Sequence, residues 1–163
     1  MEKLLELAKA GFSPSGLNAF VKDGYAFYKR YLLGLREEDE LETYFSHKTY
    51  GTLTHNCLEA LYMPYVGKQL SQSDCKDMID RVDTVADEMV KREHPQNISG
   101  KNVLALAAIK RNIQNIIAHE QGEIVAGNVI EIVALEQKLS MTQTVPGIEG
   151  PVTFKGTVDR VDK

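Results

Sequence analysis

The sequence predicts an α+β fold: a mainly helical N-terminal two-thirds, residues 1–122, followed by an antiparallel β-hairpin in residues 123–163. Two observations carry this prediction. Apolar residues recur at helical intervals as far as Ile117, whereas β-branched residues dominate after Gly122. The length of 163 residues suits one ordinary domain and is too short for two domains with cores of their own. We therefore expect residues 1–163 to belong to a single domain.

Four helices are expected in the first part of the chain. Ser13 suits a helix cap and Pro14 the first helical position, and this helix should be kinked or split at Gly24 and end at Gly34. The apolar spacing predicts three more helices, over residues 50–63, from about 73 to 94 and over residues 101–121.

Two β-rich runs follow, at residues 129–144 and 152–161, and the turn signals between them include Pro146-Gly147. This pattern is typical of an antiparallel hairpin, although the runs could also form arms on the surface. A lone hairpin is barely stable in water. Because the sequence stops at Lys163, directly after the second run, we expect it to be part of a longer protein.

Composition indicates a soluble cytoplasmic protein without a membrane span. The hydrophobic fraction is 43%, no segment approaches the roughly 20 apolar residues that cross a bilayer, and Met1 to Ala10 lack the apolar centre of a secretory signal. The two cysteines, Cys57 and Cys75, have no zinc-site spacing. The net charge of −4 argues against a bare DNA-binding module, but not against a metal site built from carboxylates.

Candidate site residues lie on the second helix and on both β-runs. His55 and Glu59 are four residues apart and should share one helix face with Tyr62, opposite the apolar residues. A single helical histidine is more often a surface side chain than a ligand. Asp159 should project from the second β-run on the face opposite Val158, and an aspartate there is a natural ligand for Mg²⁺ or Mn²⁺.

Two other acidic residues have open roles. Glu136 lies inside the first β-run and could support the site, or simply occupy the open face of the hairpin. Asp162 should lie on the strand face opposite Asp159 and be solvated or paired with Arg160.

Three segments together resemble the RecB/AddB-type branch of the PD-(D/E)XK nucleases. Residues 12–31, beginning Phe-Ser-Pro-Ser and ending Phe-Tyr-Lys-Arg-Tyr, are similar to the family pattern SxSxLxxY…CPxxFYxRY. Residues 51–62 resemble GxxxHxxLExLY, and residues 156–162 resemble GxxDRxD. The segments occur in the family's order and span most of the chain.

The resemblance implies a metal-dependent DNA exonuclease domain that acts in recombination and repair, with Mg²⁺ or Mn²⁺ as cofactor. It implies that His55 and Asp159 bind the metal and are catalytic, and that the partners are DNA and a helicase subunit or fused helicase region. The family's D/E-x-K motif follows the aspartate strand, so we expect it beyond Lys163 and expect residues 1–163 alone to be inactive. Glu136-x-Lys138 imitates that motif but precedes Asp159, and we reject it as catalytic.

The sequence departs from the AddB-type pattern at Asp23, which stands where those members have the first cysteine ligand of an iron–sulfur cluster. No such cluster is expected. Two other classes stay open: a non-catalytic DNA-binding or scaffolding module of a helicase–nuclease complex, and a helical interaction domain. The aromatic residues at positions 25, 27, 28 and 31 could stack on nucleobases, but their helical spacing favours a place in the core.

Overall fold

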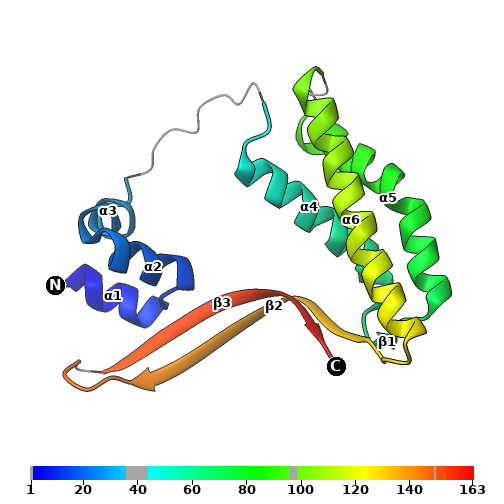
Figure 1. Ribbon diagram of the computed structural model, residues 1–163. Coiled ribbons are helices and arrows are strands. Elements are labelled where there is room, and N and C mark those ends of the chain that lie inside the picture. Colours follow the sequence, from blue (N-terminus) through cyan, green and yellow to red (C-terminus); the bar gives the residue numbers. More distant parts are fainter. Residues whose placement is uncertain (1, 36–43, 96–98, 149) are drawn as a thin grey trace. The chain divides into compact units, whose positions relative to one another are not determined.

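The computed structural model describes residues 2–35, 44–95, 99–148 and 150–163 (Figure 1). Helices come first and an antiparallel strand pair follows, which confirms the predicted α+β class. The chain divides into two compact units. One consists of residues 1–40 and 138–158, and the other of residues 41–137 and 159–163.

The described part of the first unit contains three short helices: α1 (Glu2–Ala10), α2 (Pro14–Lys22) and α3 (Gly24–Phe27), which continues as a π-helical turn over Tyr28–Leu32. Ser13 caps α2 as expected, because its Oγ accepts a hydrogen bond from the backbone N–H of Gly16 (3.1 Å). The predicted single helix is split before Gly24, where the Asp23 carboxylate caps α3. The helix α1 was not predicted.

The segment between α1 and α2 runs beside the strand β3 (Pro151–Asp162) and forms a parallel bridge between Phe12 and Phe154. The N–H of Phe12 donates to the carbonyl of Thr153 (2.8 Å), and the N–H of Lys155 donates to the carbonyl of Phe12 (2.9 Å). Gly11 makes this approach possible: its φ is +106°, and a Cβ there would lie 3.0 Å from Cδ of Lys155.

Aromatic residues of the first unit behave only partly as expected. Phe27 is buried, stacks on Tyr31 at 4.9 Å between ring centroids and meets Phe20 edge-on at 5.4 Å. Tyr25 and Tyr28 are exposed, so the expectation that most of this cluster is core is wrong for these two rings. A nine-residue helix followed by a four-residue one has too little surface to cover them all.

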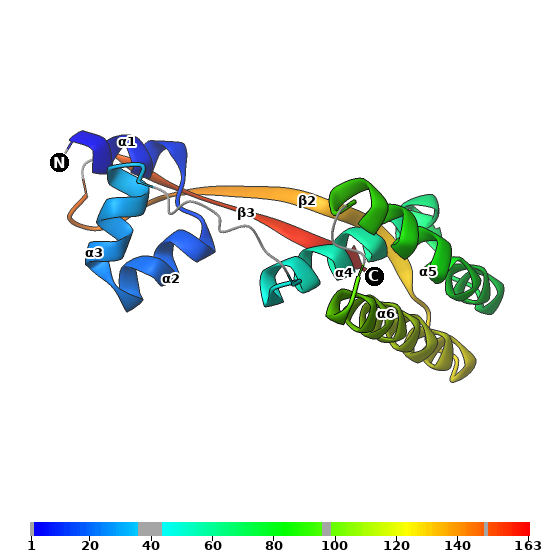
Figure 2. The same cartoon turned by 90° about the horizontal axis from the view of Figure 1, so that it is seen from above.

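The second unit is built on three longer helices, α4 (His47–Tyr62), α5 (Gln72–Glu93) and α6 (Lys101–Val125), which pack on one another (Figures 1 and 2). Ser71 caps α5 through a capping box with Asp74, so this helix begins at Gln72, one residue earlier than predicted. Each apolar side chain that is fully buried contributes about 1.5–3 kcal/mol. The largest of them are Leu53, Leu61, Met78, Val82, Ile109, Ile113, Ile117 and Ile132.

Among the described residues the sheet has three strands in the order β1-β2-β3, one more than the predicted hairpin. The extra strand, β1 (Lys68–Gln69), lies between α4 and α5 in the sequence and pairs antiparallel with the start of β2 (Glu131–Thr144), Lys68 opposite Ile132. Two residues are too few to give an alternating pattern, which is why the sequence did not reveal this strand. Within the described residues, no helix has the length and apolarity to cross a membrane.

Candidate metal centre

The helix α4 presents His55 because its opposite side is fixed in the core. Ser46 caps the helix by accepting a hydrogen bond from the N–H of Thr49 (3.2 Å). Leu53, Cys57 and Leu61 are at most 1% exposed and fix the rotation of the helix about its axis. The His55 side chain is left about one-third exposed.

Asp159 lies on the open face of β3. Its side chain is 75% exposed, whereas that of the next residue, Arg160, is only 19% exposed. Neighbouring residues of a strand point to opposite faces. The expected pairing of Arg160 with Asp162 is confirmed, with Arg160 Nε 2.6 Å from Oδ1 of Asp162.

The structure brings together His55 and Asp159, which are 104 positions apart in the sequence. His55 Nε2 lies 3.3 Å from Oδ1 of Asp159 and 2.8 Å from Oε1 of Glu136. One imidazole nitrogen and two carboxylate oxygens therefore meet, all within 4.8 Å of one another. All three residues belong to the second unit.

Glu136 reaches this cluster through an irregularity in β2. It is the non-glycine residue with positive φ, +50°, among those described. Glu131 exchanges two backbone hydrogen bonds with Lys163, and Thr142 Oγ1 lies 3.3 Å from Oγ1 of Thr153. Between these pairs β2 advances eleven positions, from 131 to 142, and β3 advances ten, from 153 to 163. Thus β2 holds one extra residue, a β-bulge that redirects the side chains around Glu136.

One oxygen of the Glu136 carboxylate lacks a hydrogen-bond partner at this position. Its Oε1 is buried and has no hydrogen-bond donor, although His55 Nε2 lies only 2.8 Å away. The two atoms are at ion-pair distance but not in hydrogen-bond geometry. An imidazole nitrogen that carries no proton would meet the carboxylate oxygen lone pair to lone pair. A buried acceptor without a donor is costly and calls for an ion or proton between the two atoms.

The distances fit a small divalent cation. Neighbouring ligands in an octahedral shell at about 2.1 Å from the ion lie about 3 Å apart, the separation that Mg²⁺ requires. The observed 2.8 and 3.3 Å bracket that value. His55, Glu136 and Asp159 could therefore supply three ligands of such a shell, with further ligands completing it.

Tyr62 does not lie where the sequence suggested. It was expected on the face of His55 and Glu59, away from the apolar residues, but it is 2% exposed and part of the core. Its hydroxyl donates to Oε2 of Glu120 on α6 (2.6 Å). Glu59, four residues from His55, does not belong to the cluster of His55, Glu136 and Asp159. Tyr62 is buried because α6 packs over the end of α4, and helical spacing alone could not predict this packing.

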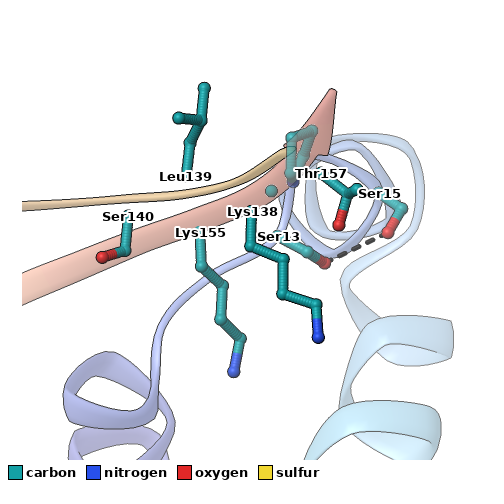
Figure 3. Close-up of a pocket in the computed structure, with 9 residues that line it drawn as sticks. Ser13, Ser15, Lys138, Leu139, Ser140, Lys155 and Thr157 are labelled. Atoms are coloured by element: carbon teal, nitrogen blue, oxygen red, sulfur yellow. Dashed lines mark hydrogen bonds between the residues drawn. The ribbon is translucent and has the colours of Figure 1, made fainter. Parts of the chain in front are cut away.

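A hollow of about 710 Å³ lies in the first unit and is lined by residues 13–15, 138–140 and 155–157 (Figure 3). Figure 3 shows the side chains of Lys138 and Lys155 pointing the same way from the two strands, with Leu139 pointing to the other side. The hydroxyls of Ser13 and Ser15 are 3.1 Å apart. The described part of the chain contributes no carboxylate to this lining, so the hollow suits an anionic group.

Comparison with known proteins identifies the family of the chain. The family model described as the PD-(D/E)XK nuclease superfamily matches residues 11–163. Neither the curated proteins nor the solved structures gave a match. The matched region contains α2 to β3 and with them His55, Glu136 and Asp159. The chain therefore belongs to the PD-(D/E)XK nuclease superfamily.

Proposed function

We propose that this chain carries the metal-binding part of a RecB-like DNA exonuclease, with His55, Glu136 and Asp159 as protein ligands of Mg²⁺ or Mn²⁺. Members of the superfamily are typically nucleases, which hydrolyse phosphodiester bonds. The observation that carries the proposal is the buried, donor-less Oε1 of Glu136 beside His55 Nε2. A buried oxygen of this kind calls for a partner, and a cation bound between Glu136 and His55 would supply one.

Each residue has a distinct part in this proposal. Asp159, three-quarters exposed, faces the solvent from which a substrate phosphate arrives and supplies negative charge to hold the cation. Glu136 and His55 hold the same cation from the protein side. When bound, the cation polarises the phosphate and activates a water molecule for attack.

DNA is the proposed partner, and the basic hollow of the first unit supports this choice. Lys138 and Lys155 can neutralise phosphate charge, and the serine hydroxyls can donate hydrogen bonds to phosphate oxygens. Exonuclease specificity, a role in recombination and repair, and a helicase partner come from the resemblance to RecB-type nucleases.

The test is cleavage of DNA by the full product of the reading frame, so that a D/E-x-K motif beyond Lys163 would be included. We expect Mg²⁺- or Mn²⁺-dependent degradation of linear DNA, no degradation of covalently closed circles, and complete loss in Asp159→Asn. Asp77→Asn is the matched control, because Asp77 is also exposed, at 60%, and lies on α5 within the same unit.

Three results would count against the proposal. If the protein cleaves closed circles as fast as linear DNA, it is an endonuclease and the exonuclease assignment is wrong. Normal cleavage by Asp159→Asn would remove the assigned site. DNA binding without cleavage under any divalent cation would favour the alternative, a non-catalytic DNA-binding or scaffolding module, which the basic hollow alone could serve.

A further inference from the structure

A largely buried cluster of Tyr62, Glu120 and Arg160 adjoins the candidate metal centre through Arg160, the residue next to Asp159. None of the three is a candidate metal ligand. The Arg160 guanidinium donates a hydrogen bond through Nη1 to Oε1 of Glu120 (2.6 Å), and Oε2 of Glu120 accepts a hydrogen bond from the Tyr62 hydroxyl (2.6 Å). The guanidinium also lies over the Tyr62 ring, 4.4 Å from its centroid. The side chains of Arg160 and Glu120 are only 19% and 15% exposed.

Burial raises the pKa of the Tyr62 hydroxyl, and its hydrogen bond to Glu120 raises it further. The tyrosine therefore stays protonated and remains a donor to Glu120. Both oxygens of Glu120 are thus occupied by donors from other elements, Tyr62 on α4 and Arg160 on β3. The guanidinium also donates through Nε to Oδ1 of Asp162 (2.6 Å), so its planar group bonds two carboxylates at once, which a lysine ammonium cannot reproduce with the same geometry.

The cluster connects the two elements that carry the metal ligands. Tyr62 follows His55 by seven residues, two turns along α4, and Arg160 is the residue next to Asp159 in β3. Within the described part of the chain, Asp159 has no comparable anchor: its side chain contacts His55 Nε2 and is mostly in solvent.

The C-terminal part of β3 also needs an anchor, because this strand is last in the sheet order and the Phe12 bridge contacts it only near Phe154. Backbone hydrogen bonds at Lys163 hold the end of the strand to Glu131, and Arg160 holds its inner face to α4 and α6. Alternation then directs Asp159 outward, toward His55.

We propose that Arg160, held by Glu120 and Tyr62, is a positioning residue that fixes the backbone of β3 so that Asp159 meets His55 and Glu136 around one cation. This inference rests on the proposed function, because it needs those three residues to bind a metal. Groups that orient metal ligands typically change metal affinity 10- to 100-fold when they are removed.

The experiment measures Mn²⁺ affinity of residues 1–163 by electron paramagnetic resonance, with circular dichroism as a check that each variant is folded. Arg160→Lys keeps the charge but loses the planar guanidinium that bonds Glu120 and Asp162 together, and we expect about a tenfold weaker affinity. The triple variant Tyr62→Phe/Glu120→Met/Arg160→Met replaces the whole cluster by apolar groups. Such a replacement is often neutral for stability or stabilising, yet we expect at least the same tenfold loss of affinity.

Lys110→Met is the control. Lys110 on α6 pairs with Asp87 on α5 (2.8 Å), so its removal breaks another inter-helix ion pair in the same unit without touching β3. We expect its Mn²⁺ affinity to equal that of the wild type. Wild-type affinity in the folded triple variant would overturn the positioning role. If the triple variant does not fold, Arg160→Lys decides alone: a tenfold loss supports the role and an unchanged affinity overturns it.

Failure of this inference can be told apart from failure of the proposed function. If wild type and Asp159→Asn bind Mn²⁺ equally, the three-residue site itself is wrong, whatever Arg160 does. If Asp159→Asn loses Mn²⁺ binding while both cluster variants keep it, the metal site stands and only the positioning role falls.

Discussion

Replacing Glu136 by glutamine should separate the stability of the fold from its metal binding. In the metal-free protein, a buried acceptor without a donor costs about 1–3 kcal/mol. Glutamine keeps the size of the side chain and offers an amide N–H that can donate to His55 Nε2, which lies 2.8 Å from the present oxygen. The substitution also removes the negative charge of Glu136, which lies close to that of Asp159, and so relieves repulsion between them. We therefore expect Glu136→Gln to raise the free energy of unfolding in EDTA by about 1 kcal/mol.

The same substitution should weaken the metal site. A cation present at about 100 times its dissociation constant stabilises the folded protein by about 2.7 kcal/mol, and the variant should lose most of that gain. Urea unfolding followed by circular dichroism at pH 8, with EDTA or with Mn²⁺, measures both effects.

Glu131→Gln, in the same strand, serves as the control and should change the free energy of unfolding by no more than about 0.5 kcal/mol. A Glu136→Gln protein that is less stable than wild type in EDTA, yet keeps the full stabilisation by Mn²⁺, would show that Glu136 is a structural partner. The inference from its orphaned oxygen would then be refuted.

Three other predictions concern the core and the cysteines. Ile113→Ala, at a fully buried position between the long helices, should lower the free energy of unfolding by about 2–5 kcal/mol in urea titrations, and a loss below about 1 kcal/mol would contradict the described core. Burial, followed by the charge of Glu93, raises the pKa of the Cys57 thiol to about 11. At pH 8 only about one Cys57 in a thousand is then a thiolate, so a thiol reagent should label it slowly until guanidinium unfolds the protein; fast labelling of the folded chain would be the opposite result. Iron and acid-labile sulfide should be absent from the purified protein, because Asp23 caps α3 and both cysteines are buried in the core, and a brown preparation containing both would overturn this.

The helices could be predicted from the sequence because their signals are local. Ser13 and Ser71 cap helices through their own hydroxyls, and the core residues of α4, α5 and α6 recur at helical spacing. Elements that depend on distant partners escaped prediction. The strand β1 exists because residues 68 and 69 pair with β2, and the bridge of Phe12 to Phe154 joins segments 142 positions apart.

The candidate site shows the same division. His55 and Asp159 could be proposed because each lies in a short motif, and the structure places them 3.3 Å apart. The sequence left the role of Glu136 open, since its direction depends on a bulge in the pairing of β2 with β3 and on a φ of +50° that side chains other than glycine rarely adopt. The hydrogen bonds from Tyr62 and Arg160 to Glu120 join α4, β3 and α6. They could not be predicted from the spacing of residues within any one of these elements.

The central claim is that His55, Glu136 and Asp159 bind one divalent cation, and paramagnetic broadening by Mn²⁺ tests it most directly. The chain has four histidines, at positions 47, 55, 94 and 119, whose imidazole resonances can be followed separately by NMR. Substoichiometric Mn²⁺ should broaden the His55 resonances first in the wild type, and this selectivity should disappear in Asp159→Asn. Equal broadening of all four imidazoles, or selective broadening of His55 that persists in Asp159→Asn, would contradict the shared metal site.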